Sequence, residues 1–197
     1  MTNFLNITCR VMALVIGLCG VTALQGQTLQ QSDEAYAKKD YKTAFEGYRK
    51  LGNQGNATAQ FQLGLMYHQG EGQTKDDTKA LFWYRKAADQ GNSNAQFNVG
   101  LMYHNGEAVA KNEQQAVSWL LKAAQQGHSQ AQSNLVIHYF NGLGTPKDLE
   151  KAYYWLLIYS QPNDAEAAKN VASLQSMLSP EQQARVKAQV QEFKPKQ

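Results

Sequence analysis

Two histidines, His68 and His104, are the side chains in this 197-residue sequence best suited to bind a metal ion. Each ends the same pentapeptide, Gly-Leu-Met-Tyr-His, and an imidazole nitrogen binds Zn²⁺ at about 2.0–2.1 Å. If these segments form neighbouring helices, their axes lie about 8–10 Å apart, and both rings would have to converge on one ion. The equivalent position 36 residues further on is Phe140, so no third ligand follows. We therefore expect polar or stacking roles and no metal site, and we assign no ligand role to His128 or His138.

Short patterns that mark common catalytic sites are missing from the sequence. No serine is followed by a lysine three residues later, and there is no Gly-x-Ser-x-Gly, His-Glu-x-x-His or Gly-Lys-Ser. We interpret Gly70-x-Gly72 as the end of a helix and the start of a loop, not as a phosphate-binding turn. The sequence therefore predicts neither an enzyme nor a cofactor.

The three tryptophans, Trp83, Trp119 and Trp155, recur every 36 residues and permit two interpretations. A row of exposed indoles would stack on sugar rings. The first two, however, have Ala four residues later, on the same face of a helix, and large aromatic side chains contribute most when they are packed in a core. We expect these tryptophans to be buried between helices.

The first 26 residues have the pattern of a secretory signal peptide. Arg10 precedes an uncharged apolar run over 11–24, and small residues allow cleavage after Ala23 or after Gly26. The alternative, an uncleaved anchor, would need about 20 apolar residues to cross a bilayer, more than this run has. Cleavage would remove both cysteines, Cys9 and Cys19, so the mature chain would contain no disulfide and no thiol nucleophile. We expect an exported protein, in the periplasm or else secreted, without an integral membrane segment after cleavage.

Beyond the signal, the sequence repeats with a period of 36 residues. Residues 57–92 and 93–128 align without gaps and are identical at 18 of 36 positions. Residues 129–164 are a degenerate third copy, in which Val136, Tyr159 and Asn163 replace a Gly, an Ala and a Gly. Residues 27–56 match the second half of the unit only. A fixed period of this length is typical of stacked helical repeats.

Each unit has the pattern helix, loop, helix. Apolar and small residues recur at helical spacing from Phe61 to His68, and glycines then stop the first helix. Asp76 or Asp77 is suited to begin the second helix, which Gly91 ends. In the tail, 165–197, Ser179-Pro180 starts a last helix, so we expect a pair of capping helices there.

The repeat unit resembles the Sel-one-like repeat (SLR), an α/α repeat of the tetratricopeptide superfamily. The matching residues are Ala59, Leu63-Gly64, Tyr67, Gly70-x-Gly72 and Lys79-Ala80-x-x-Trp83-Tyr84-Arg85-Lys86-Ala87-Ala88-x-Gln90-Gly91-Asn92. The resemblance implies an all-α, right-handed solenoid that acts as a scaffold for other proteins. Many secreted relatives carry a cysteine pair in each repeat, which this chain lacks. The hydrolase or penicillin-binding activity attributed to that cysteine-rich branch is therefore kept only as an alternative, an envelope hydrolase acting on cell-wall fragments.

The same resemblance implies that the first helix of each unit lines the concave face. The residues expected to contact a protein or peptide partner there are Phe61, Leu65, His68, Asn94, Phe97, Leu101, His104, Asn105, Ile137 and Phe140. This surface is nearly uncharged, so we expect binding that depends weakly on salt. An alternative is that Phe61 and Phe97 are buried between successive units. A net charge of only +3 gives no electrostatic reason to expect nucleic-acid binding.

Overall fold

The computed structural model describes residues 29–160 and 165–195 of the chain. The expected signal peptide with its two cysteines, and Asn163 in the third repeat, lie outside these residues. Within them the fold is all-α, as predicted, with no strand. Helical residues 29–37 are followed by α2 (Tyr41–Asn53), α3 (Ala57–Gln69), α4 (Asp77–Asp89), α5 (Ser93–Asn105), α6 (Glu113–Gln125), α7 (Ser129–Asn141), α8 (Leu149–Tyr159), α9 (Ala165–Ser176) and α10 (Pro180–Glu192).

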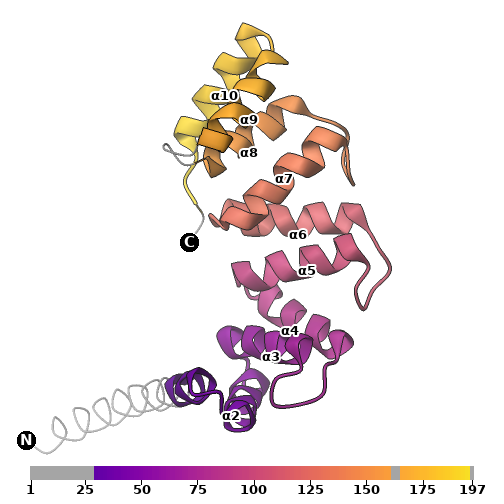
Figure 1. Cartoon of the computed structure of the whole chain (residues 1–197), viewed down its shortest axis with the longest axis vertical. Coiled ribbons are helices and arrows are strands. Elements are labelled where there is room, and N and C mark those ends of the chain that lie inside the picture. The colour runs from indigo at the N-terminus through magenta and orange to yellow at the C-terminus, as the bar shows by residue number, and fades with distance from the viewer. Residues whose placement is uncertain (1–28, 161–164, 196–197) are drawn as a thin grey trace, which may run out of the picture.

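The helices stack as an elongated array, in which each helix from α2 to α8 packs against the next in the chain (Figure 1). The pairs α3–α4, α5–α6 and α7–α8 form the repeats, while α4–α5 and α6–α7 form the junctions between them. At the far end, α9 and α10 both pack against α8. None of the helices between residue 29 and residue 195, outside the short gap at 161–164, is both long and apolar enough to cross a membrane.

Equivalent residues cap equivalent helices, which explains why the helices begin at the same place in each unit. The side chains of Asn56 and Asn92 accept hydrogen bonds from the backbone at the starts of α3 and α5. Asp76, one of the two residues predicted for this role, caps α4 in the same way. The predicted capping box of Ser179 and Gln182 begins α10. These caps satisfy backbone N–H groups that a helix start leaves unpaired.

The apolar core is divided into three clusters, each of which spans a boundary between neighbouring units. Trp83, Trp119 and Trp155 are all buried in them, which confirms the packing role expected from the sequence. Trp155 also contacts Phe193 at the end of α10, with ring centroids 6.0 Å apart. The tail thus covers one side of α8, although Tyr159 at the end of this helix is exposed.

A buried glutamine at the start of each repeat's first helix connects the repeats through polar contacts. The Nε2 groups of Gln60, Gln96 and Gln132 donate to the carbonyls of Gly52, Ala88 and Ala124 in the preceding helix, at 2.9–3.1 Å. The side-chain oxygens of the first two in turn accept from Gln90 and Gln126, at 2.6 and 2.7 Å. Because a buried amide is costly unless it is hydrogen-bonded, this ladder fixes how successive units sit on one another.

Candidate functional site

The residues predicted to bind a partner differ in how far the structure exposes them. Phe97 is buried, with 8% of its surface exposed, and its ring stacks on that of His128 at a centroid distance of 4.6 Å. Of the two roles considered for Phe97, contact with a partner and burial between successive units, the structure therefore shows burial. Leu65 and Phe61 are partly buried against the core cluster formed by α4, α5 and α6. These positions are less available to a partner than the repeat pattern indicated.

Three residues of the predicted set are exposed, two in the second repeat and one in the third. Asn94 and Asn105 are exposed at the two ends of α5. Leu101 and Phe140 are partly buried against the core cluster centred on α6, α7 and α8. Ile137, in the middle of α7, has 52% of its surface exposed and is the most exposed apolar residue of the predicted set. Ile137 is therefore the predicted apolar residue most accessible to a partner.

A groove of about 370 Å³ lies beside Ile137, between α7, α8 and α9. Its walls are apolar, its edges carry amide and hydroxyl groups, and none of its residues is charged. The lining consists of Ser133, Val136, Ile137, Phe140, Asn141, Leu156, Tyr159, Asn170, Ser173 and Leu174.

A larger hollow of about 770 Å³ lies along α8 and α10 and has a different character. Its aromatic floor includes Tyr154, Trp155 and Phe193, but charged groups of both signs surround it, among them Lys151 and Glu192. Lys151 is already paired with Asp148, at 3.1 Å. No pattern in the sequence analysis indicated this hollow, because α10 has no counterpart in the repeats.

The histidines of the first two repeats pair with acidic residues of their own unit. Nδ1 of His68 lies 2.8 Å from a carboxylate oxygen of Asp77, and Nδ1 of His104 lies 2.8 Å from one of Glu113. In each pair the histidine is in the last turn of the unit's first helix, and the acid is the first residue of its second helix. Sequence reasoning considered the two histidines as a pair with each other and missed their acidic partners.

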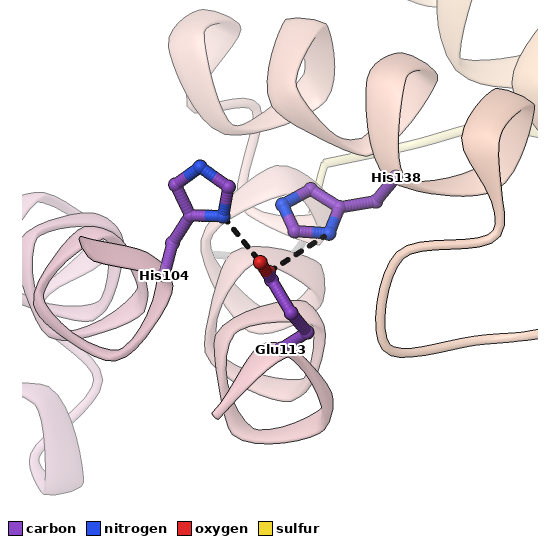
Figure 2. A group of neighbouring side chains, drawn as sticks. All are labelled: His104, Glu113 and His138. Carbon is purple, nitrogen blue, oxygen red and sulfur yellow. Dashed lines mark hydrogen bonds and ion pairs between the residues drawn. The ribbon is translucent and has the colours of Figure 1, made fainter. Parts of the chain in front are cut away.

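His138 joins the second of these pairs (Figure 2). Its ring meets that of His104 edge-on, at a centroid distance of 5.3 Å, and its Nδ1 lies 3.8 Å from the Glu113 carboxylate. From the sequence, His138 is a plain replacement of Met, and no third donor is expected near His104. That expectation was wrong, because α7 of the following repeat packs against α6 and brings His138 to the pair.

Burial and hydrogen bonding set the charge states of this cluster. Burial lowers the pKa of His138, although its hydrogen bond to the Leu143 carbonyl and the nearby Glu113 carboxylate oppose this shift. Burial by itself would raise the pKa of Glu113, but hydrogen bonds from His104 and Lys111 outweigh it and lower the pKa. The cluster therefore combines a neutral, buried imidazole with an ionised carboxylate.

Comparison with known proteins identifies the family to which the chain is similar. The Sel1 repeat model matches residues 57–92, 93–128 and 129–158, together more than half of the chain. None of the curated proteins matches the sequence. A crystal structure of a Sel1 repeat protein from Oxalobacter formigenes is similar, with 34% identity and a TM-score of 0.68 over 73% of this chain and 59% of that one.

Two further solved structures share the fold. One is c5321, a protective antigen present in uropathogenic Escherichia coli strains, with 30% identity and a TM-score of 0.55 over 77% of this chain and 40% of that one. The other is cysteine-rich protein B of Helicobacter pylori, with 21% identity and a TM-score of 0.52 over 67% of this chain and 95% of that one. This chain spans only 59% and 40% of the first two relatives' lengths. The repeat geometry and the match to the family model together establish that this chain belongs to the Sel1 repeat family.

Proposed function

We propose that this protein is an exported, non-enzymatic scaffold that binds an extended or helical segment of a partner protein in the groove between α7, α8 and α9. The observation that supports this most directly is Ile137, a large apolar side chain that is half exposed at the edge of an uncharged groove. Family membership supports the coarser part of the proposal, because Sel1 repeats are interaction scaffolds.

The lining of the groove indicates the kind of segment that would bind. Ile137 and Phe140 offer apolar contacts, while Ser133, Asn141 and Asn170 offer hydrogen bonds around them. An apolar centre with a polar rim is typical of specific protein interfaces. The partner segment is therefore expected to present apolar side chains, and its affinity should change little with salt concentration.

A matched pair of substitutions tests this site. Ile137→Asp places a charge beside the groove, and Phe82→Asp places the same charge at a residue of α4 that is equally exposed, at 52%. Mature protein used as bait in an envelope extract should capture a partner, identified by mass spectrometry. We expect Ile137→Asp to lose that partner and Phe82→Asp to retain it. Retention by a folded Ile137→Asp variant, with the same affinity as wild type, would rule out the groove.

Export is tested separately. Cleavage after Ala23 or Gly26 predicts a mature N-terminus at Leu24 or Gln27, which N-terminal sequencing of protein from the envelope fraction measures. Recovery of a chain that starts at Met1 would contradict export. The alternative function, hydrolysis of cell-wall fragments, predicts product release by the purified protein, and turnover in that assay would overturn the scaffold proposal.

A further inference from the structure

The junction between the second and third repeats brings together three side chains that are common metal ligands. His104 comes from the last turn of α5, Glu113 from the first residue of α6, and His138 from α7 (Figure 2). One donor atom from each of them lies within 4.8 Å of the other two. We propose that His104, Glu113 and His138 bind a divalent transition-metal ion with the chemistry of Zn²⁺.

The donor set determines the class of ion. Two imidazoles and one carboxylate suit Zn²⁺ and its transition-metal neighbours, whereas Ca²⁺ and Mg²⁺ prefer oxygen ligands only. A tetrahedral Zn²⁺ with bonds of about 2.0–2.1 Å places its ligands about 3.4 Å apart. Nδ1 of His104 and Oε2 of Glu113 already lie 2.8 Å apart, and no pair of donors is more than 4.8 Å apart. The longer separations must therefore shorten by roughly 1 Å, which rotation of the partly exposed His104 and Glu113 side chains can supply.

His138 is held in an orientation suited to a ligand. Only 2% of its surface is exposed, and its Nδ1–H donates to the Leu143 carbonyl at 3.0 Å. This leaves Nε2 without a proton, and that nitrogen points toward His104 in Figure 2. Metal-bound histidines commonly donate their other ring N–H to a backbone carbonyl in this way, which fixes the ring and its tautomer.

The loop after α7 holds the second ligand as well. Gly144, next to Leu143, has a φ of +69° and lies so close to the backbone of Glu113 that a Cβ at this position would overlap it. The same short loop therefore positions both His138, through the Leu143 carbonyl, and the start of α6, through Gly144. The ring of His138 and the backbone of Glu113 are in this way held in place before any ion binds, while the Glu113 side chain stays free to rotate.

The present partners of Glu113 do not prevent binding. Lys111 contacts one carboxylate oxygen, Oε1, at 3.0 Å, while the imidazoles face the other oxygen, Oε2. The Lys111 side chain is largely exposed, so it can turn away without losing a buried partner. The partial exposure of His104 leaves one side of the cluster open, so that a fourth position on the ion is accessible to water or to a ligand from a bound protein.

Titration with Zn²⁺ alone tests this proposal, using tag-free full-length protein that has been treated with a chelator. Isothermal titration calorimetry should show one saturable site that depends on the cluster, and Zn²⁺ should raise the melting temperature. His138→Met is the matched variant, because Met102 occupies the equivalent position one repeat earlier. We expect His138→Met and Glu113→Gln each to weaken binding by about tenfold or more and to abolish the thermal shift.

Two controls separate the cluster from other zinc ligands in the chain. His68→Gln alters the equivalent pair in the first repeat and should leave the cluster's affinity unchanged. Cys9 and Cys19 are present in every variant, so any binding to them does not contribute to the differences between variants. If His138→Met does not fold, His104→Gln, which alters a partly exposed residue, replaces it. Zn²⁺ binding of equal affinity in wild type and in the folded variant, or no saturable binding in wild type, would overturn the proposal.

Discussion

The first and second repeat junctions have the same pair at the same place but differ in what the next repeat adds. His68–Asp77 and His104–Glu113 are hydrogen-bonded at the same distance, 2.8 Å. The following repeat contributes Met102 at the equivalent position in the first case and His138 in the second. The pair thus belongs to the repeat scaffold, and a single position in the next unit determines whether the junction carries a third donor.

The loops of the two junctions differ in a related way. Gly144, after α7, and Ala108, the equivalent residue after α5, both have left-handed backbone conformations, with φ of +69° and +58°. Glycine adopts this conformation freely, whereas alanine does so at a cost. The left-handed conformation therefore costs little in the loop of the junction with three donors, where the residue is Gly144. It costs more in the loop of the other junction, where the residue is Ala108.

The largest expected effects come from the tryptophans of the two junctions. Trp119 is in the core cluster that contains α4 and α5, and Trp155 is in the cluster that contains α7 and α8. Replacing either with Ala should cost about 3–5 kcal/mol, because a large packed side chain is lost. Urea denaturation followed by circular dichroism measures this cost. Stability equal to that of wild type would mean that the tryptophan is exposed, and would favour the sugar-stacking interpretation.

A smaller and unequal effect is expected for the glycine inside the first helix of each of the first two repeats. A Cβ at Gly64 would overlap the rigid ring of Tyr84, so Gly64→Ala should destabilise by about 1–3 kcal/mol. At Gly100 the Cβ would lie 3.0 Å from Cγ of Leu120 and 3.3 Å from the Ala116 carbonyl oxygen, which are tight contacts but not an overlap. The higher helix propensity of Ala then offsets the strain, and Gly100→Ala should stay within about 1 kcal/mol of wild type.

Thermal and urea denaturation of these two variants compare the repeats directly. In the third repeat the equivalent residue is Val136, so that repeat already folds with a Cβ at this position. Equal losses in Gly64→Ala and Gly100→Ala would show that the identity of the facing side chain, Tyr84 or Leu120, does not matter.

The smallest effect is expected in the loop of the first junction. Ala108→Gly removes the cost of a left-handed alanine but increases the entropy of the unfolded chain, for a net gain of about 0.5–1 kcal/mol. Gly144→Ala is the reverse change and should destabilise, because its Cβ would overlap Glu113. The midpoints of urea unfolding measure both. A loss of stability in Ala108→Gly would contradict the inference that the left-handed conformation is costly in the first loop and not in the second.

Much of the fold could be predicted because its signals are local. Helix starts depend on side chains such as Asp76 and Ser179, which act within three residues of their own position. The period of 36 then identifies equivalent residues without knowledge of the packing. Burial of the tryptophans follows from the same pattern, since Ala neighbours make room for a large ring.

The site depends on contacts between units, which the period does not describe. His138 lies 34 residues after His104, so the comparison of equivalent positions passed over it and selected Phe140 instead. Phe97 differs from Phe61 because His128 replaces Asn92 at the end of the unit and covers its ring. One substitution, in the next unit for His104 and at the end of the same unit for Phe97, thus changed the surroundings of a residue that the repeat pattern treated as equivalent.

The ladder of buried glutamines, Gln60, Gln96 and Gln132, also has a consequence for how the gene can lose one whole repeat. The first three units each present an equivalent carbonyl to the next unit's glutamine. Loss of residues 93–128 by unequal recombination would therefore place Gln132 against the Ala88 carbonyl, with Asn92 in place to cap the helix that follows. Such a deletion would also bring His138 to the His68–Asp77 pair. The chain would become shorter by one whole unit, and a junction with two histidines and one acid would survive the deletion.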